Sequence, residues 1–260
     1  MIKAVFFDID GTLVSFKTHS IPQSTIDAIA ILKKKGIKIF IATGRPFPLI
    51  NNLGSLKFDG YITLNGSYTL TGDKKPIHKN GIKKEDIEAL VRYQQDGKGF
   101  PCTFVTSDEI FVSGRNHKVA EIEKLLNMNF GEDQDFSYVL DKEVLQVVAF
   151  FDEGSEESIM KEVLPNCTSA RWNDLFTDVI AKGNSKRSGI DRILEHYDID
   201  LSEAVSFGDG GNDIPMLEYT PISIVMGNAS DEVKKYATLV TDSVDEDGVW
   251  NALKKLGLIN

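Results

Sequence analysis

Cysteine is scarce in this chain, because Cys102 and Cys167 are the only two among 260 residues. Two cysteines provide neither a disulfide framework nor a cysteine-based zinc site, and they suit a reducing compartment. The 21 glycines and 8 prolines are also too few for a low-complexity or disordered chain. The composition is therefore that of a globular protein, and the length allows one large domain or two of ordinary size.

Positive charge is in deficit, since 29 lysines and arginines face 39 aspartates and glutamates and leave a net charge of −10. Proteins that bind nucleic acid need a basic face that neutralises phosphates. We therefore expect no nucleic-acid partner.

Long apolar runs are missing as well. No segment approaches the roughly 18 consecutive apolar residues of a membrane span. The apolar run at the N-terminus is interrupted at Asp8, which is too early for a secretory signal. We therefore expect no membrane partner and a cytoplasmic location.

Short apolar segments alternate with amphipathic ones at both ends of the chain. Short buried strands that alternate with helices are typical of parallel βαβ units, so we expect an α/β fold with a doubly wound parallel sheet. The expected strands are Ala4–Ile9, Ile37–Ala42, Tyr61–Leu64, Ala204–Phe207, Ile222–Met226 and Leu239–Thr241, and the expected helices lie between Pro22 and Gly36 and at Ser185–Tyr197 and Asp231–Ala237.

Residues 82–184 have a different texture, with paired strands that suggest antiparallel hairpins between helices. They contain 11 basic and 20 acidic residues, for a net charge of −9, whereas the rest of the chain has a net charge of −1. We therefore expect a core of residues 1–81 and 185–260, interrupted by an inserted α+β domain. The expected helices are Glu85–Gln95, Val119–Leu126 and Ser155–Leu164, and the expected strands are Cys102–Thr106, Ile110–Ser113, Val144–Phe151, Ser169–Trp172 and Phe176–Ala181.

Polar side chains follow the ends of four predicted core strands. Ligands of open α/β sheets bind at the carboxyl ends of the strands, so we expect these side chains to meet in one crevice. Several carboxylates in one crevice are costly unless a cation neutralises them. The segments are Asp8-Ile9-Asp10-Gly11-Thr12, Thr43-Gly44-Arg45, Asn65-Gly66 and Gly208-Asp209-Gly210-Gly211-Asn212-Asp213, and Lys186 begins the helix before the last of these strands.

A hard cation with oxygen ligands is the natural partner of such a crevice. Mg²⁺ binds through one or two carboxylates together with waters and substrate phosphate. We assign Asp8 and Asp209 as direct ligands and the Asp10 carbonyl as a third.

The same crevice offers groups that could hold a phosphate. The Thr43 hydroxyl, the Lys186 ammonium and backbone N–H groups of the glycine-rich turns, including that of Gly44, are suitable donors. A carboxylate at the rigid end of a strand can form an aspartyl-phosphate, which favours Asp8 as the nucleophile. Asp10 would then protonate the leaving oxygen and later accept a proton from water.

Together, DIDGT at 8–12, TGR at 43–45, Lys186 and GDGGND at 208–213 resemble the four motifs of the haloacid dehalogenase (HAD) superfamily of phosphotransferases. Their order and spacing are similar to those of its Cof-like, type IIB phosphatases. The long insertion after the third strand matches the cap position of that class. The resemblance implies a HAD-like Rossmannoid core at 1–81 and 185–260 and a cap at 82–184 that sets substrate specificity.

The resemblance also implies roles for individual residues. Besides Asp8 and Asp10 in catalysis, Thr43 and Lys186 on phosphate and Asp209 on Mg²⁺, it assigns four further positions. Asn212 and Asp213 match positions that orient phosphate, metal-bound water or the lysine. Asn65 matches a position close to the substrate phosphate, and Arg45 matches one that faces the cap.

Each of these residues also has a purely structural alternative. The Asp–Gly pairs could simply make turns after strands, although two such motifs at strand ends disfavour this. Thr43 could cap a helix, and Asp213 could do the same. Lys186 and Arg45 could be surface residues, and Asn65-Gly66 could be a hairpin turn.

The leading hypothesis is a Mg²⁺-dependent phosphatase of small phosphomonoesters, with sugar phosphates favoured as substrates. The acidic insertion disfavours polyanions, so a neutral, hydroxyl-rich leaving group is expected. Two alternatives stay open. One is a hexose-phosphate mutase, which should carry a basic cluster in the insertion. The other is a non-catalytic protein that senses sugar phosphates, although both Asp8 and Asp10 are present.

Overall fold

A computed structural model describes residues 1–260, with the exception of the Lys98 side chain. The chain divides into two compact units. The core unit comprises Met1–His78 and Ser185–Asn260, and the inserted unit comprises Lys79–Asn184. The sequence-based boundaries are after residue 81 and after residue 184.

The core unit is built on an eight-stranded sheet with the strand order β13-β12-β11-β1-β2-β3-β4-β5. The strands from β13 to β3 are parallel, and β4 runs antiparallel to β3. The predicted α/β class with a parallel sheet is confirmed. The strands are β1 (Ala4–Phe7), β2 (Lys38–Ala42), β3 (Gly60–Thr63), β4 (Tyr68–Thr71), β5 (Pro76–Lys79), β11 (Ala204–Gly208), β12 (Ile222–Val225) and β13 (Leu239–Val240).

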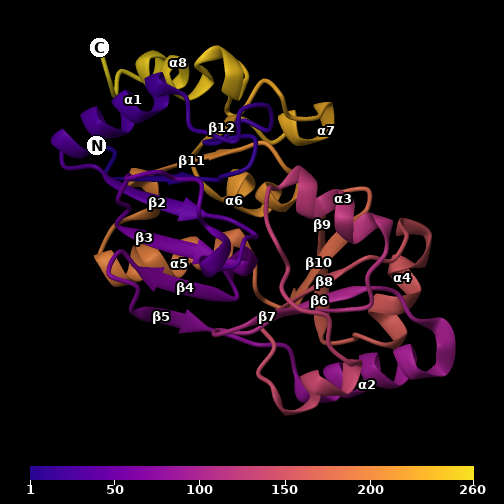
Figure 1. Cartoon of the computed structure of the whole chain (residues 1–260). Helices are drawn as coiled ribbons and strands as arrows, with labels where there is room; N and C mark the ends of the chain where they lie inside the picture. The colour runs from indigo at the N-terminus through magenta and orange to yellow at the C-terminus, as the bar shows by residue number, and fades with distance from the viewer. The chain divides into compact units, whose positions relative to one another are not determined.

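Helices cover both faces of this sheet (Figure 1). Val5 and Phe7 of β1 pack in a cluster with residues of α1 and α8, whereas Ala4 and Phe6 pack in a second cluster with residues of α5, α6 and α7. The strand is thus buried on both faces, which explains its continuous apolar sequence. The helices are α1 (Gln23–Lys34), α5 (Lys186–Tyr197), α6 (Ile214–Tyr219), α7 (Asp231–Lys234) and α8 (Gly248–Lys255).

Several predicted strand ends were wrong by one or two residues, and two of the differences matter. The first strand ends at Phe7, because the Ile9 carbonyl accepts hydrogen bonds from the backbone of Leu13 and Val14 in a turn. The third strand ends at Thr63, because Leu64 has φ of +52° and turns the chain. Both endings leave polar residues at the sheet edge. Strands β4 and β5 and helix α8 were not predicted.

The inserted unit has an antiparallel five-stranded sheet with the order β7-β6-β8-β10-β9. Leu90 of α2 and Ile159 of α4 pack with Phe104 and Val147 over one face. The predicted α+β texture is therefore observed. The elements are α2 (Lys84–Tyr93), β6 (Cys102–Val105), β7 (Ile110–Ser113), α3 (His117–Leu125), β8 (Gln146–Ala149), α4 (Glu153–Glu162), β9 (Cys167–Asn173) and β10 (Phe176–Ala181).

The two cysteines lie in this second unit. Both Cys102 and Cys167 are buried, and neither forms a disulfide. Burial raises the pKa of both thiols, so they remain protonated and behave as small apolar side chains.

Candidate active site

Adjacent parallel strands bring the predicted site residues to one edge of the core sheet. In the ladder, Phe7 is the partner of both Phe207 on β11 and Ile41 on β2. Asp8 and Thr43 therefore follow their strands at the same edge, and Asp209 follows β11 there as well. The sheet places side chains side by side that are up to two hundred residues apart in the sequence.

A buried ammonium links two of these carboxylates. Lys186, the first residue of α5, is fully buried and donates to Asp8 Oδ1 and to Asp213 Oδ1, both at 2.5 Å. Asp213 uses its other oxygen to accept hydrogen bonds from the backbone of Asp209 at 2.9 Å and Gly210 at 2.8 Å. The surface alternative for Lys186 is excluded by this burial. The capping alternative for Asp213 is wrong for α6, because the Asp213 side chain makes no cap hydrogen bond to that helix and instead holds the lysine and the turn at Gly210.

The carboxylates at this edge outnumber the ammonium. Burial raises the pKa of Asp8 to about 7, against the opposing effect of Lys186, and the Asp213 carboxylate adds to the rise. Burial also raises the pKa of Asp209, and the nearby carboxylates of Asp8 and Asp213 raise it further. Burial alone would lower the pKa of Lys186, but Asp213 and Asp8 outweigh it and raise that pKa. The lysine therefore stays charged, and the raised pKa values of Asp8 and Asp209 show that their ionised forms are not fully neutralised by it.

This charge deficit fits a divalent cation. One carboxylate oxygen from each of Asp8, Asp209 and Asp213 lies within 4.8 Å of the others. Hard carboxylate oxygens are the donors that Mg²⁺ prefers. Asp213 is engaged at both oxygens in holding Lys186 and the backbone of the turn, so Asp8 and Asp209 could hold the cation while Asp213 holds the lysine.

The second aspartate of the first loop has a different partner. Arg45 Nε donates to Asp10 Oδ2 at 2.5 Å, and its Nη2 donates to Oδ1 at 2.6 Å. Arg45 is only 5% exposed and also donates to the Leu49 carbonyl. The surface alternative for Arg45 is therefore excluded. The guanidinium holds the Asp10 carboxylate in a bidentate pair, a contact that the motif did not predict.

The remaining predicted residues line the same edge. The Thr43 hydroxyl accepts a hydrogen bond from the Arg45 backbone at 3.1 Å, so it closes a short turn across Gly44 and does not cap a helix. Asn212 Nδ2 donates to Asn65 Oδ1 at 3.0 Å, which joins the loops after β3 and β11.

The turn that contains Asn65 is a hairpin connection, and its backbone is in an unusual conformation. It connects β3 to β4 with Thr63 opposite Tyr68, so the hairpin alternative is correct as a description of the backbone. Leu64 and Asn65 nevertheless have φ of +52° and +50°, in the left-handed region, which asparagine tolerates but leucine seldom adopts. Backbone strain of this kind is concentrated at functional sites.

Two residues that hold Asp209 were not assigned from the sequence. Thr12 Oγ1 donates to Asp209 Oδ1 at 2.9 Å, and Asn228 Nδ2 donates to Asp209 Oδ2 at 3.1 Å. Thr12 belongs to the DIDGT motif. Asn228 follows β12 at the same sheet edge, and this position was the only signal that could have found it.

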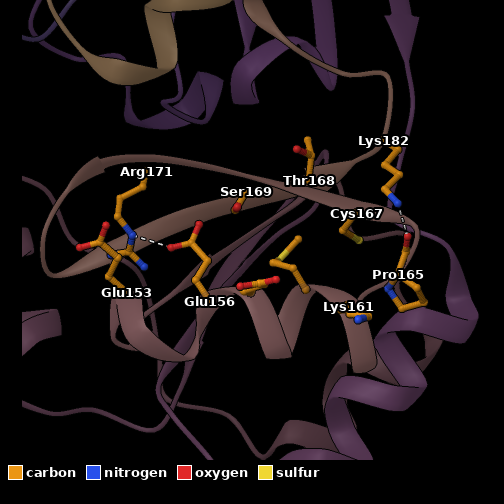
Figure 2. A pocket seen from close by; sticks show the side chains of 11 residues that line it. Glu153, Glu156, Lys161, Pro165, Cys167, Thr168, Ser169, Arg171 and Lys182 are labelled. Carbon is orange, nitrogen blue, oxygen red and sulfur yellow. Dashed lines mark hydrogen bonds and ion pairs between the residues drawn. The ribbon is translucent and has the colours of Figure 1, made fainter. Parts of the chain in front are cut away.

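The inserted unit has a hollow of its own, of about 710 Å³, between α4 and the edge strand β9 (Figure 2). Two of its cations are held by neighbouring groups: Arg171 Nε donates to Glu156 at 2.6 Å, and Lys182 Nζ donates to the Pro165 carbonyl at 2.5 Å (Figure 2). The hollow thus has no counterpart to the buried carboxylate cluster of the core unit.

Within the part of the chain that the structure describes, no helix has the length and apolar character needed to cross a lipid bilayer.

The sequence and fold agree with those of known proteins. The family model of haloacid dehalogenase-like hydrolases matches residues 5–253. YkrA of Bacillus subtilis (strain 168), which is named as a phosphatase, is 35% identical over 99% of this chain and 98% of its own length. The solved HAD subclass IIB sugar phosphatase BT4131 is 45% identical, with a TM-score of 0.93 over 99% of this chain and all of that one. These matches confirm the predicted family and the predicted phosphatase class.

A further solved relative agrees with this result. BT1666 of Bacteroides thetaiotaomicron, studied among HAD phosphatases, is 36% identical with a TM-score of 0.91. The match covers all of this chain and 96% of that one. The similarity therefore extends over the sequences of both the core unit and the inserted unit.

Proposed function

We propose that this chain, which belongs to the haloacid dehalogenase-like hydrolase family, is a Mg²⁺-dependent phosphatase of small phosphomonoesters. Its proposed substrates are sugar phosphates, and its proposed intermediate is an aspartyl-phosphate on Asp8. The observation that carries the proposal is the buried Lys186 ammonium between Asp8 and Asp213, beside a third carboxylate. This arrangement keeps a nucleophilic carboxylate rigid and partly neutralised.

Asp8 and Asp209 would hold the cation. A bound divalent ion would supply positive charge that offsets the repulsion between a phosphate ester and an anionic nucleophile. Hydrogen bonds from neighbouring groups orient these two carboxylates without the ion. Lys186 orients one oxygen of Asp8, and Thr12 and Asn228 each hold one oxygen of Asp209.

In the first step, an Asp8 oxygen attacks phosphorus and the bond between phosphorus and the leaving oxygen breaks. The leaving oxygen takes a proton from Asp10 and departs as an alcohol. In the second step, water attacks the phosphorus of the aspartyl-phosphate, gives a proton back to Asp10, and releases inorganic phosphate and the Asp8 carboxylate. Lys186 and the backbone of the Thr43 turn would stabilise negative charge on the phosphoryl oxygens.

Arg45 has a defined place in this scheme. Its two charge-assisted hydrogen bonds hold both oxygens of the Asp10 carboxylate in one orientation. Donating a proton to the leaving group requires Asp10 to turn away from Arg45. The proposal therefore includes one rearrangement, the release of Asp10 from the guanidinium in the first step.

The choice of sugar phosphates rests on two observations. BT4131, a sugar phosphatase, resembles this chain over its full length. Residues 82–184 carry a net charge of −9, so we propose that this insertion selects neutral, hydroxyl-rich leaving groups over polyanions. Its role as the domain that sets specificity is part of the same proposal.

Phosphate release from a panel of sugar phosphates, nucleotides and an aryl phosphate, measured with Mg²⁺, tests the substrate class. We expect the highest kcat/KM for sugar phosphates. Chromatography of the sugar products separates hydrolysis from a mutase reaction, which would yield an isomeric sugar phosphate. A protein that releases no phosphate from any member of the panel would contradict the proposal.

Substitution of Asp8 by asparagine tests the intermediate. The variant Asp8→Asn should lose turnover, because an amide cannot form the aspartyl-phosphate. Acid quenching of the wild type during turnover of a radiolabelled ester should leave label on the protein, and the variant should stay unlabelled. If the variant kept more than about a tenth of the wild-type rate, Asp8 would not be the nucleophile.

A further inference from the structure

We propose that Asn228 is a positioning residue that fixes the Asp209 carboxylate for the divalent cation; this inference rests on the proposed metal site. Asn228 Nδ2 donates to Asp209 Oδ2 at 3.1 Å and to the Gly11 carbonyl at 2.9 Å. Its Oδ1 accepts a hydrogen bond from the Val244 backbone at 3.0 Å. One side chain thus joins three loops at the sheet edge.

Both carboxylate oxygens of Asp209 are restrained by neighbouring side chains. Thr12 holds Oδ1 at 2.9 Å, and Asn228 holds Oδ2. Gly11 lies so close, with φ of +89°, that an added Cβ would be 2.1 Å from Oδ2. A carboxylate held at both oxygens keeps one rotamer, which is the condition for a metal ligand of fixed geometry.

The backbone holds Asn228 itself in place. The Gly227 N–H donates to the Asp242 carbonyl at 3.0 Å, and a Cβ at residue 227 would be 2.7 Å from the Ser243 nitrogen. The close approach between these chains therefore requires glycine before Asn228. It also directs the asparagine toward the loop that contains Gly11.

The chemistry of an amide suits this role better than that of a cation. Lysine or arginine at residue 228 would bind Asp209 but would also neutralise it and compete with a metal ion. A neutral amide orients the carboxylate and leaves its negative charge available. Asn228 is also exposed, so it does not fill the hydrophobic core, and its replacement should leave the fold intact.

The test measures binding of Mg²⁺ and of Ca²⁺ to the full chain by calorimetry, without substrate. Asn228→Ala and Asn228→Leu should each raise the Kd for Mg²⁺ about tenfold. The Kd for Ca²⁺ should rise less, because Mg²⁺ demands nearly ideal octahedral ligands and Ca²⁺ tolerates displaced ones. The melting temperature of the metal-free variants should stay close to that of the wild type.

Asn251→Ala is the matched control. Asn251 is also exposed in the core unit, and its amide donates to Asp242 Oδ2 at 2.8 Å and to the Glu246 carbonyl at 3.2 Å. The Asn251→Ala variant should bind Mg²⁺ with the same Kd as the wild type. A Kd for Mg²⁺ in the Asn228 variants equal to that of the control, or an equal weakening for both ions, would overturn the positioning role. A wild type that binds no Mg²⁺ would instead overturn the proposed metal site.

Discussion

The two units of this protein differ in where their charged side chains lie. The core unit is nearly neutral in sequence, yet it buries the Lys186 ammonium completely between Asp8 and Asp213. The inserted unit carries most of the negative charge of the chain, yet its ion pairs lie largely at the surface, as in the pair between Lys118 and Asp152, whose side chain is 82% exposed.

This difference separates charges that have little effect on stability from charges that are costly to bury. A surface pair changes stability little, whereas a buried ionised group must be matched by partners or it destabilises the fold. The core unit gains no obvious stability from three carboxylates around one ammonium. The proposed cation and phosphate ester would explain why this cluster is there, and the proposed selection of the leaving group would explain why the inserted unit can stay acidic.

Removal of the divalent cation should have the largest effect on this contrast. Chelation should lower phosphatase activity by more than about a hundredfold, because the buried carboxylates would then repel the substrate. Added Mg²⁺ should restore the activity. The measurement is the rate of phosphate release from an aryl phosphate, and activity that is indifferent to the chelator would contradict a metal-dependent site.

Removal of the buried ammonium should come next. Lys186→Met leaves Asp8 and Asp213 without their shared partner, so the free energy of unfolding should fall by about 3–5 kcal/mol and activity by at least about a hundredfold. Lys118→Met removes a partly exposed lysine of the inserted unit and should leave both quantities close to wild type. Denaturant unfolding of the two variants compares the units directly. Equal effects would remove the distinction between buried and surface charge.

The pH dependence of stability should sharpen the contrast further. The pKa of Asp8 is raised to about 7 in the folded protein, so Asp8 binds a proton more readily when folded than when unfolded. Its contribution to stability is therefore present at about pH 4 and is lost as the pH rises through 7.

The metal-free variant Asp8→Asn avoids this loss. At about pH 8 it should be more stable than the metal-free wild type, by on the order of 1–3 kcal/mol, and at about pH 4 the two should be similar. Denaturant unfolding at both pH values gives the measurement. A difference that does not grow with pH would show that the Asp8 carboxylate is not the destabilising group.

A polar pair in the inserted unit should give the smallest effect. Gln146 Nε2 donates to Asp178 Oδ1 at 3.2 Å, and both side chains are buried. Side chains along β8 and β10 alternate between the two faces of the sheet. Gln146 and Asp178 therefore lie on the face opposite to Val147 and Val179, which pack with α2 and α4.

Because this pair is polar and lies away from the hydrophobic cluster, we expect Asp178→Asn to change the ranking of sugar phosphates by about tenfold in kcat/KM. Turnover of an aryl phosphate should stay within about twofold of wild type. Asp174→Asn, at an exposed turn, is the control and should change neither. A variant that loses both activities equally would contradict a role limited to selection.

Much of the fold could be predicted because its signals are local. The apolar run that begins at Ala4 predicts a strand buried on both faces, and Phe6 and Phe7 do pack on opposite faces of the sheet. The hairpin of β4 and β5 was not predicted, because it lies in short, mixed segments at the edge of the sheet. The ends of several strands were also missed, since they depend on turns such as the one at Leu64, whereas Ile110–Ser113 and Phe176–Ala181 were predicted with their exact bounds.

The residue types of the site and their places after predicted strands can be read from the chain alone, because motifs such as DIDGT consist of adjacent residues. The contacts among these groups appear only in the folded molecule: Arg45 on Asp10, Lys186 between two carboxylates, and Asn228 on Asp209. These pairs join residues far apart in the chain. Their partners depend on strand order, side-chain rotamers and the balance of buried charge, none of which a local pattern encodes.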